Sequence, residues 1–287
     1  MTMTRSEWID YARAHLEVRH ATQNGAYRAG RTIRPEGCVN HSLGVAQPSA
    51  DVMYGRMDRT DAGWGVNAIL GDFHTGEGRI LLCMPYDRRP WGVGSGSRGS
   101  WNDSRIQWEV CEPAGHTYAG GTMVGYDVVK NQDYFDRMWK LLVAWNVFMA
   151  VELGYDAATI NDHAESYRAG MGSNHADMGQ WLPKHGKSMN HLRHEVQAIL
   201  DQKEEDTVTE EQVRQIVAEE LERLLPPQKI YTRVDELPQW AQPSTEELLA
   251  AGILRGNQSG LLQLTDDDLK WVSALARLLN LVERTQV

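Results

Sequence analysis

Apolar residues recur along the first part of the chain in two rhythms, one typical of strands and one of helices. Short apolar runs separated by Gly, Asp and Pro predict strands at residues 66–70, 80–84 and 106–110. Between residues 134 and 153 the apolar positions instead recur at intervals of three and four and stop at Gly154, which predicts a long amphipathic helix. Strands followed by a long covering helix predict an α/β fold in which helices flank a mixed central sheet, ending near residue 200.

Local start signals predict further helices. Thr4-x-x-Glu7 is a capping box, and it opens an apolar stripe that runs to Leu16. Residues 49–57 suit a short helix, whereas the Gly- and Arg-rich residues 21–36 suit a loop.

The pattern changes after residue 200. Residues 201–206 are polar, and a second capping box from Thr209 opens an apolar stripe that ends at Pro226-Pro227. A last segment has helix start signals at Ser244 and Thr265. We therefore predict three parts: a main domain at 1–200, a linker helix at 201–227 and a small, mostly helical module at 228–287.

Composition and charge exclude several classes of function. The chain has 287 residues and a net charge of −10, and residues 196–287 carry most of that charge with 17 acidic against 9 basic side chains. Such a chain is not expected to bind nucleic acid or an anionic membrane surface. The sequence also lacks an apolar run of the ~18 residues that membrane insertion needs. The first residues do not form a basic-then-apolar secretory signal. We expect synthesis in the cytoplasm without a signal peptide.

Three cysteines at positions without CxxC spacing do not suggest a disulfide framework. Cys38, Cys83 and Cys111 all lie in apolar surroundings, so we predict that they are small buried residues.

Three short motifs carry residues suited to zinc or to acid–base chemistry. They are Asn40-His41-Ser42, His163 just beyond the long helix, and Ser173-Asn174-His175-Ala176-Asp177. A catalytic zinc site needs three ligands from His, Asp, Glu or Cys and an open position for water. Spacing alone does not select a trio, because the chain has ten histidines.

The order of these motifs resembles the type 2 N-acetylmuramoyl-L-alanine amidases, a family that includes endolysins and peptidoglycan recognition proteins. The resemblance covers about residues 36–200 and rests on residues 38–48, 106–112 and 163–177. Residues 173–177 and 181–189, with Arg193, are similar to the amidases of Gram-positive gut bacteria and their phages.

The resemblance implies roles for individual residues. His41, His163 and Asp177 match the three Zn²⁺ ligands, with His175 as the alternative third ligand. Glu109 matches the general base. His175 also falls where many relatives place a lysine that stabilises the oxyanion. Glu109 and His175 are therefore the two expected catalytic residues. Trp91, Ser95 and Asn174 are expected to contact the substrate.

The implied activity is zinc-dependent hydrolysis of the bond between N-acetylmuramic acid and L-alanine in peptidoglycan, by an endolysin that acts on the cell wall after release. Two alternatives stay open: a non-catalytic peptidoglycan-binding protein of the same fold, and a zinc peptidase that cuts the stem peptide. The segment from Trp240 to the last helix resembles one S-layer homology unit, which implies cell-wall binding. Residues 209–287 could equally form a homo-oligomer.

Overall fold

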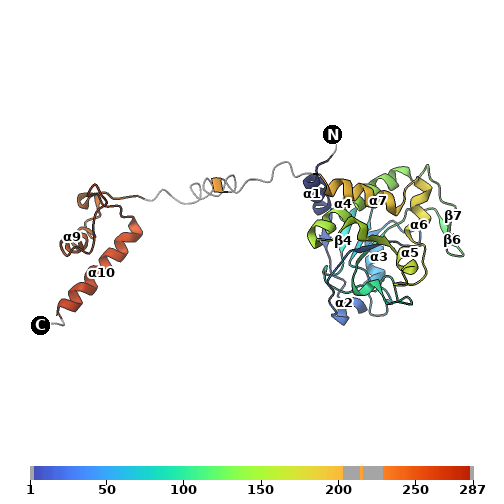
Figure 1. Cartoon of the computed structure of the whole chain (residues 1–287), viewed down its shortest axis with the longest axis horizontal. Coiled ribbons are helices and arrows are strands. Elements are labelled where there is room, and N and C mark those ends of the chain that lie inside the picture. Colours follow the sequence, from blue (N-terminus) through green and yellow to red (C-terminus); the bar gives the residue numbers. More distant parts are fainter. Residues whose placement is uncertain (1–2, 203–213, 216–228, 285–287) are drawn as a thin grey trace. The chain divides into compact units, whose positions relative to one another are not determined.

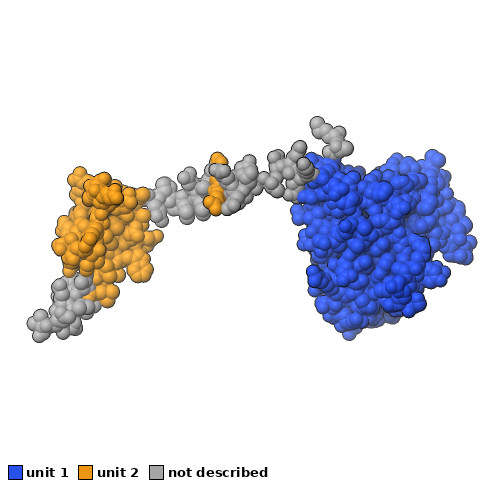
Figure 2. Space-filling model, viewed as in Figure 1, with its two compact units in different colours: residues 1–205 blue, residues 206–287 orange. Residues whose placement is uncertain are grey.

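The computed structural model describes residues 3–202, 214–215 and 229–284, with side chains described up to Leu278 in the last helix. The chain divides into two compact units, Met1–Glu205 and Asp206–Val287 (Figures 1 and 2). The linker helix that the capping box at Thr209 predicts lies almost entirely outside the described residues. None of the described helices is long and apolar enough to cross a membrane.

A six-stranded mixed sheet forms the centre of the first unit. The strands lie in the order β1-β4-β3-β5-β2-β8, and only the β3–β4 pair is antiparallel. The three strands predicted from the sequence are confirmed as β3, β4 and β5. Both ends of β3 and β4 differ from the prediction by one or two residues, and β5 has the predicted bounds. The strand bounds are Leu16–Val18 (β1), Cys38–Ser42 (β2), Ala68–Gly71 (β3), Arg79–Leu82 (β4), Ile106–Val110 (β5) and Ile160–Asp162 (β8).

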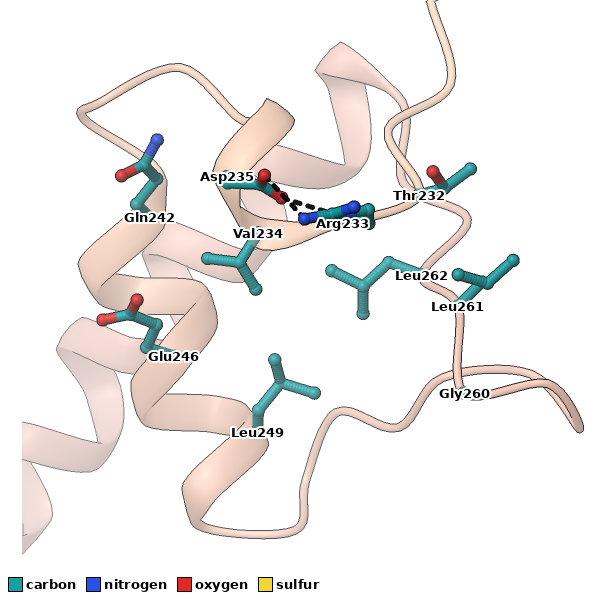
Figure 3. A pocket seen from close by; sticks show the side chains of 10 residues that line it. All are labelled: Thr232, Arg233, Val234, Asp235, Gln242, Glu246, Leu249, Gly260, Leu261 and Leu262. Atoms are coloured by element: carbon teal, nitrogen blue, oxygen red, sulfur yellow. Dashed lines mark hydrogen bonds and ion pairs between the residues drawn. The ribbon is translucent and has the colours of Figure 1, made fainter.

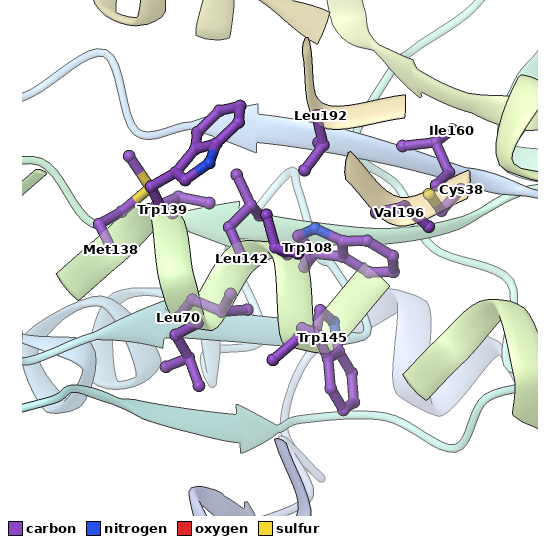
Figure 4. Packing of buried hydrophobic residues seen from close by; sticks show 14 of the residues in the cluster. Cys38, Leu70, Trp108, Met138, Trp139, Leu142, Trp145, Ile160, Leu192 and Val196 are labelled. Carbon is purple, nitrogen blue, oxygen red and sulfur yellow. The ribbon is translucent and has the colours of Figure 1, made fainter. Parts of the chain in front are cut away.

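One face of the sheet is covered by the long helix α4 (Gln132–Leu153), with α1 (Arg5–Ala14) and α7 (Met189–Leu200) packed beside it. The predicted long helix and its stop are confirmed, since Gly154 closes α4 in the left-handed conformation at φ 69°. Large side chains of α4 and the sheet interlock in this core, where the Trp108 and Trp145 rings lie edge to face with centroids 5.8 Å apart (Figure 4). The main core of the unit therefore lies on this face.

The opposite face of the sheet carries a smaller apolar cluster under α3 (Ala50–Met57), the short helix predicted after Ser49. Ser49 accepts a hydrogen bond from the Val52 amide and so caps the helix. Met53 and Met57 pack on this face with Ile69 of β3. The three cysteines are buried, as predicted.

The structure differs from the sequence expectations near the N-terminus. Helix α1 ends at Ala14 although the apolar stripe continues to Leu16, because residues 16–18 pair with β4 as strand β1. A short helix α2 (Gly25–Ala29) interrupts the predicted loop at 21–36, and the side chain of Asn24 caps it. The remaining elements of this unit are the hairpin β6 (Thr117–Ala119) and β7 (Thr122–Val124), helices α5 (His163–Arg168) and α6 (Met178–Trp181), and single turns at Trp101–Asp103, Ala157–Thr159 and Leu182–His185.

The second unit is mostly helical, as predicted, and contains α9 (Gln242–Ala250) and α10 (Asp266–Arg284). The predicted helix start at Ser244 is wrong, because α9 begins at Gln242 and Thr245 bonds back to the Ala241 carbonyl from inside the helix. A pocket of about 460 Å³ lies beside α9, with the Arg233–Asp235 ion pair at its edge (Figure 3). The small apolar core of the second unit consists of Tyr231, Leu237, Ala241, Leu248, Leu262, Leu264, Leu269, Val272 and Ala276.

Candidate metal centre

Strands β2 and β5 place two of the candidate residues side by side. The strands are parallel, and His41 of β2 is the register partner of Glu109 of β5. Side chains alternate between the faces of a sheet, so both point to the α3 face, whereas Asn40 and Trp108 point into the α4 core. There the Trp108 indole donates to the Asn40 side chain at 2.7 Å. The site therefore begins at the carboxyl ends of parallel strands, a frequent place for ligand sites in α/β folds.

His163 is brought to the same edge by strand β8, which pairs with β2. It is the first residue of α5, and the preceding Asp162 caps that helix in a capping box with Glu165. Arg193 of α7 donates to both carboxylate oxygens of Glu165, at 3.1 and 3.0 Å. These bonds fix the start of the helix and with it the backbone of His163.

Asp177 occupies an unusual backbone conformation, with φ 38° and ψ −119°. A non-glycine residue in such a region costs about 1–3 kcal/mol, and strain of this kind is concentrated at functional sites. The conformation turns the carboxylate toward the two histidines.

The three side chains His41, His163 and Asp177 converge on one point. Asp177 Oδ2 lies 2.8 Å from His41 Nδ1 and 3.0 Å from His163 Nδ1. The ligand atoms of the group all lie within 4.8 Å of one another, so this group could hold a metal ion. Both histidines are buried, and the Asp177 side chain is 13% exposed.

The charge state of Asp177 fits a cation site. Burial opposes ionisation of its carboxyl, but the close contacts with the His163 and His41 rings outweigh that effect and hold the pKa of Asp177 well below its ordinary value. Two imidazole nitrogens and one charged carboxylate oxygen form a donor set typical of catalytic zinc sites. The residues present therefore suit the metal that the sequence resemblance implies.

Glu109 lies on the floor of the same site. Its Oε2 atom is buried and has no hydrogen-bond partner among the described residues. Burial, followed by the nearby charges of Asp177 and Glu112, raises the pKa of Glu109 well above its ordinary value. A carboxyl group in this state can exchange a proton with a molecule in the site.

The three candidate ligands and Glu109 line a cleft of about 720 Å³. His175 lines this cleft, with its ring centroid 4.5 Å from that of His163, and Trp91 lines it as well. Ser95 and Asn174 are exposed and do not belong to the lining. The structure thus places six of the eight candidate residues in one cleft and two outside it.

Sequence reasoning missed several residues of the cleft. Arg56, Trp64, Tyr118 and Gln180 line it but come from loops and elements far apart in the chain, and no local pattern distinguishes them. Gln107 was also missed, although a signal existed: together with Glu109 it alternates with apolar residues along β5 and therefore shares the face of the site.

No family model matches the chain, and no curated protein sequence matches it. Several solved structures are similar to it in fold. The hydrolase AmiA of Staphylococcus aureus, solved with its ligand, is 18% identical at a TM-score of 0.45, over 68% of this chain and 89% of AmiA. A mutant endolysin from Bacillus subtilis is 14% identical at a TM-score of 0.42, over 63% of this chain and 97% of the endolysin.

The N-acetylmuramyl-L-alanine amidase AmiD from E. coli, solved with a muramyl-peptide substrate, is 17% identical at a TM-score of 0.35, over 47% of this chain and 50% of AmiD. At such identities the similarity concerns the fold.

Proposed function

We propose that the first unit is a zinc-dependent N-acetylmuramoyl-L-alanine amidase, which hydrolyses the amide bond between N-acetylmuramic acid and L-alanine in peptidoglycan as an endolysin of a phage or prophage. One observation carries the proposal: two imidazoles and a carboxylate from two distant parts of the chain converge in a cleft, next to a glutamate whose Oε2 atom is buried and has no partner among the described residues. Metal-assisted hydrolysis needs this combination of ligands and proton acceptor.

In this proposal His41, His163 and Asp177 hold the ion. A zinc ion supplies Lewis-acid activation of water and of a carbonyl group. Glu109 takes the proton of the attacking water on Oε2 and delivers it to the leaving nitrogen of L-alanine, so that one water is consumed and one amine and one carboxyl group are formed. His175, at the open side of the cleft, donates a hydrogen bond from Nε2 of its imidazolium form to the oxygen on which negative charge develops.

The lining of the cleft suits a muramyl peptide. Trp64 and Trp91 offer aromatic faces on which a sugar ring can stack, and Arg56 offers a guanidinium for a carboxylate of the stem peptide. We assign Ser95 and Asn174 to the outer rim, where they could touch a longer glycan chain. The second unit is then an accessory module for wall binding or oligomerisation.

Digestion of purified peptidoglycan tests the proposal. We expect release of muropeptides with new L-alanine amino groups, no new reducing sugar ends, loss of activity with a chelator and its return with Zn²⁺. New amino groups on residues other than L-alanine would instead support the stem-peptide peptidase. Binding of wall fragments without any cleavage by the zinc-loaded protein would support the non-catalytic binding protein and refute the amidase.

A further inference from the structure

We propose that Gln107 and Ser173, both anchored on the segment 92–102, are positioning residues that keep the Nε2 proton on His41 and His163 and so leave Nδ1 of each ring free to bind the metal. The inference rests on the metal site of the proposed function. It concerns residues outside the group that would bind the ion. It follows from which atoms can donate and which can only accept.

The argument for His41 starts at Asn102. Its Oδ1 atom receives the backbone N–H groups of Gly92 and Val93, each at 3.2 Å, and a backbone N–H can only donate, so the contacting atom of Asn102 must be the oxygen. The same oxygen lies 2.9 Å from Gln107 Nε2, which therefore points its amino group at Asn102. This leaves Gln107 Oε1, an acceptor, 3.2 Å from Nε2 of His41, so that nitrogen carries the proton.

The argument for His163 starts at the Val93 carbonyl, which can only accept. Ser173 Oγ lies 3.0 Å from this carbonyl oxygen and must donate its single proton to it. Toward His163 Nε2 and His175 Nδ1, each at 3.1 Å, Ser173 Oγ can then only accept. His163 Nε2 therefore carries a proton as well.

When both rings are neutral, their Nδ1 atoms consequently present lone pairs to the same acceptor, Asp177 Oδ2, at 2.8 and 3.0 Å. Lone pairs that face one another at such distances repel, and a metal ion bound by all three atoms removes that repulsion. Outer partners that fix the ring tautomer are a general feature of histidine metal sites. Here one segment supplies both anchors, Asn102 for His41 and Val93 for His163.

Gly92 belongs to this arrangement because of its lack of a side chain. A Cβ atom at position 92 would lie 2.1 Å from Gln107 Oε1 and 3.2 Å from His41 Nε2. Any larger residue must push the Gln107 amide away from the imidazole, so Gly92→Ala should disturb His41 without removing any polar group.

Two measurements test the inference on the full chain. Long-range ¹H–¹⁵N NMR spectra of the metal-free protein report which ring nitrogen carries a proton, and chelator competition with Zn²⁺ alone reports affinity without any assay of hydrolysis. The variants are Gln107→Leu, Gly92→Ala and Ser173→Ala. Gln197→Leu on α7 is the matched control.

In the unaltered protein we expect protonated Nε2 on both His41 and His163. Gln107→Leu allows His41 to move its proton to Nδ1 and donate it to Asp177, where it competes with the ion. We expect Zn²⁺ to bind about 10- to 100-fold more weakly in this variant, in Gly92→Ala and in Ser173→Ala. Gln197→Leu should stay within about 3-fold of the unaltered protein, a range well below that outer-partner effect.

A bare Nε2 on His41 in the unaltered protein, or unchanged Zn²⁺ affinity in a folded Gln107→Leu variant, overturns the inference. If Gln107→Leu does not fold, the spectra of the unaltered protein and the Ser173→Ala affinity still decide. Protonated Nε2 atoms and tight Zn²⁺ binding without cleavage of peptidoglycan would refute the amidase and leave this inference standing.

Discussion

The imidazole rings of His41 and His163 lie edge to face with their centroids 4.9 Å apart, although one lies in strand β2 and the other begins a helix far along the chain. The pairing of β8 with β2 brings them together, and each ring points Nδ1 at the same oxygen of Asp177. The site is thus built by the order of strands in the sheet. Its properties can be tested one side chain at a time.

Asp177 is expected to be the third metal ligand, and His175 is not. Asp177→Ala removes the only charged donor of the group, so we expect Zn²⁺ affinity to fall by more than the roughly 100-fold that marks the upper range for an outer partner. His175→Ala should retain one Zn²⁺ per chain, because the converging ligand atoms belong to His41, His163 and Asp177. Metal analysis after dialysis measures both. A full complement of Zn²⁺ in Asp177→Ala would make His175 the ligand.

Glu109 is expected to serve the proton transfer without holding the ion. Glu109→Gln keeps the size of the side chain but cannot accept a proton, so kcat for release of L-alanine amino groups should fall by about 10²- to 10⁴-fold. The Zn²⁺ content should not change. Glu77→Gln, on the surface of the same unit and bonded to Tyr11, is the matched control and should retain full activity. Loss of Zn²⁺ from Glu109→Gln would instead make Glu109 a ligand.

Removal of Asn40 from the core is expected to destabilise the first unit. The Asn40 Oδ1 atom receives both the Trp108 indole at 2.7 Å and the Asn146 amide at 3.1 Å. Asn40→Ala leaves two buried donors without an acceptor, and each such donor costs about 1–3 kcal/mol of stability. We therefore expect the free energy of unfolding to fall by about 2–5 kcal/mol, measured by urea denaturation.

Asn174→Ala provides the control for that measurement. The Asn174 side chain is exposed, and a surface change of this kind should alter stability by no more than about 0.5 kcal/mol. Equal losses in the two variants would contradict the role given to the core amides.

The sequence predicted those elements whose signals are local. The capping box of Thr4, the glycine stop at Gly154 and the apolar runs that became β3, β4 and β5 each depend on neighbouring residues. Strand β1 was not predicted, because residues 16–18 gain their backbone partners only from β4. Helix α2 depends on a single capping side chain within a Gly-rich stretch.

The candidate site was predicted through motifs, whereas its surroundings were not. His41 and Asp177 stand in short motifs that resemble a known family, but Asn102 and Gln107 act through contacts across the sheet and a loop. Such contacts are set by register and by the close approach of Gly92, neither of which a single sequence reveals. Trp64 and Tyr118 reach the cleft for the same kind of reason.

His185 is expected to make the first unit less stable in mild acid. Its ring stacks on Phe135 with centroids 3.9 Å apart, and its Nε2 lies 2.8 Å from the Tyr126 hydroxyl. Burial lowers the pKa of His185 below its ordinary value of 6.5, with Asp136 opposing the shift. The unfolded chain therefore takes up this proton first as the pH falls, and stability is lost from about pH 6.5 downward, whereas above that pH the residue contributes no pH dependence.

Calorimetric Tm values at pH 7.5 and 5.5, read from the larger unfolding transition, measure the effect. His185→Phe keeps the stacking and removes the titration, so the difference between the two Tm values should be smaller than in the unaltered protein. An equal or larger difference would show that His185 takes up its proton as readily in the folded chain as in the unfolded one.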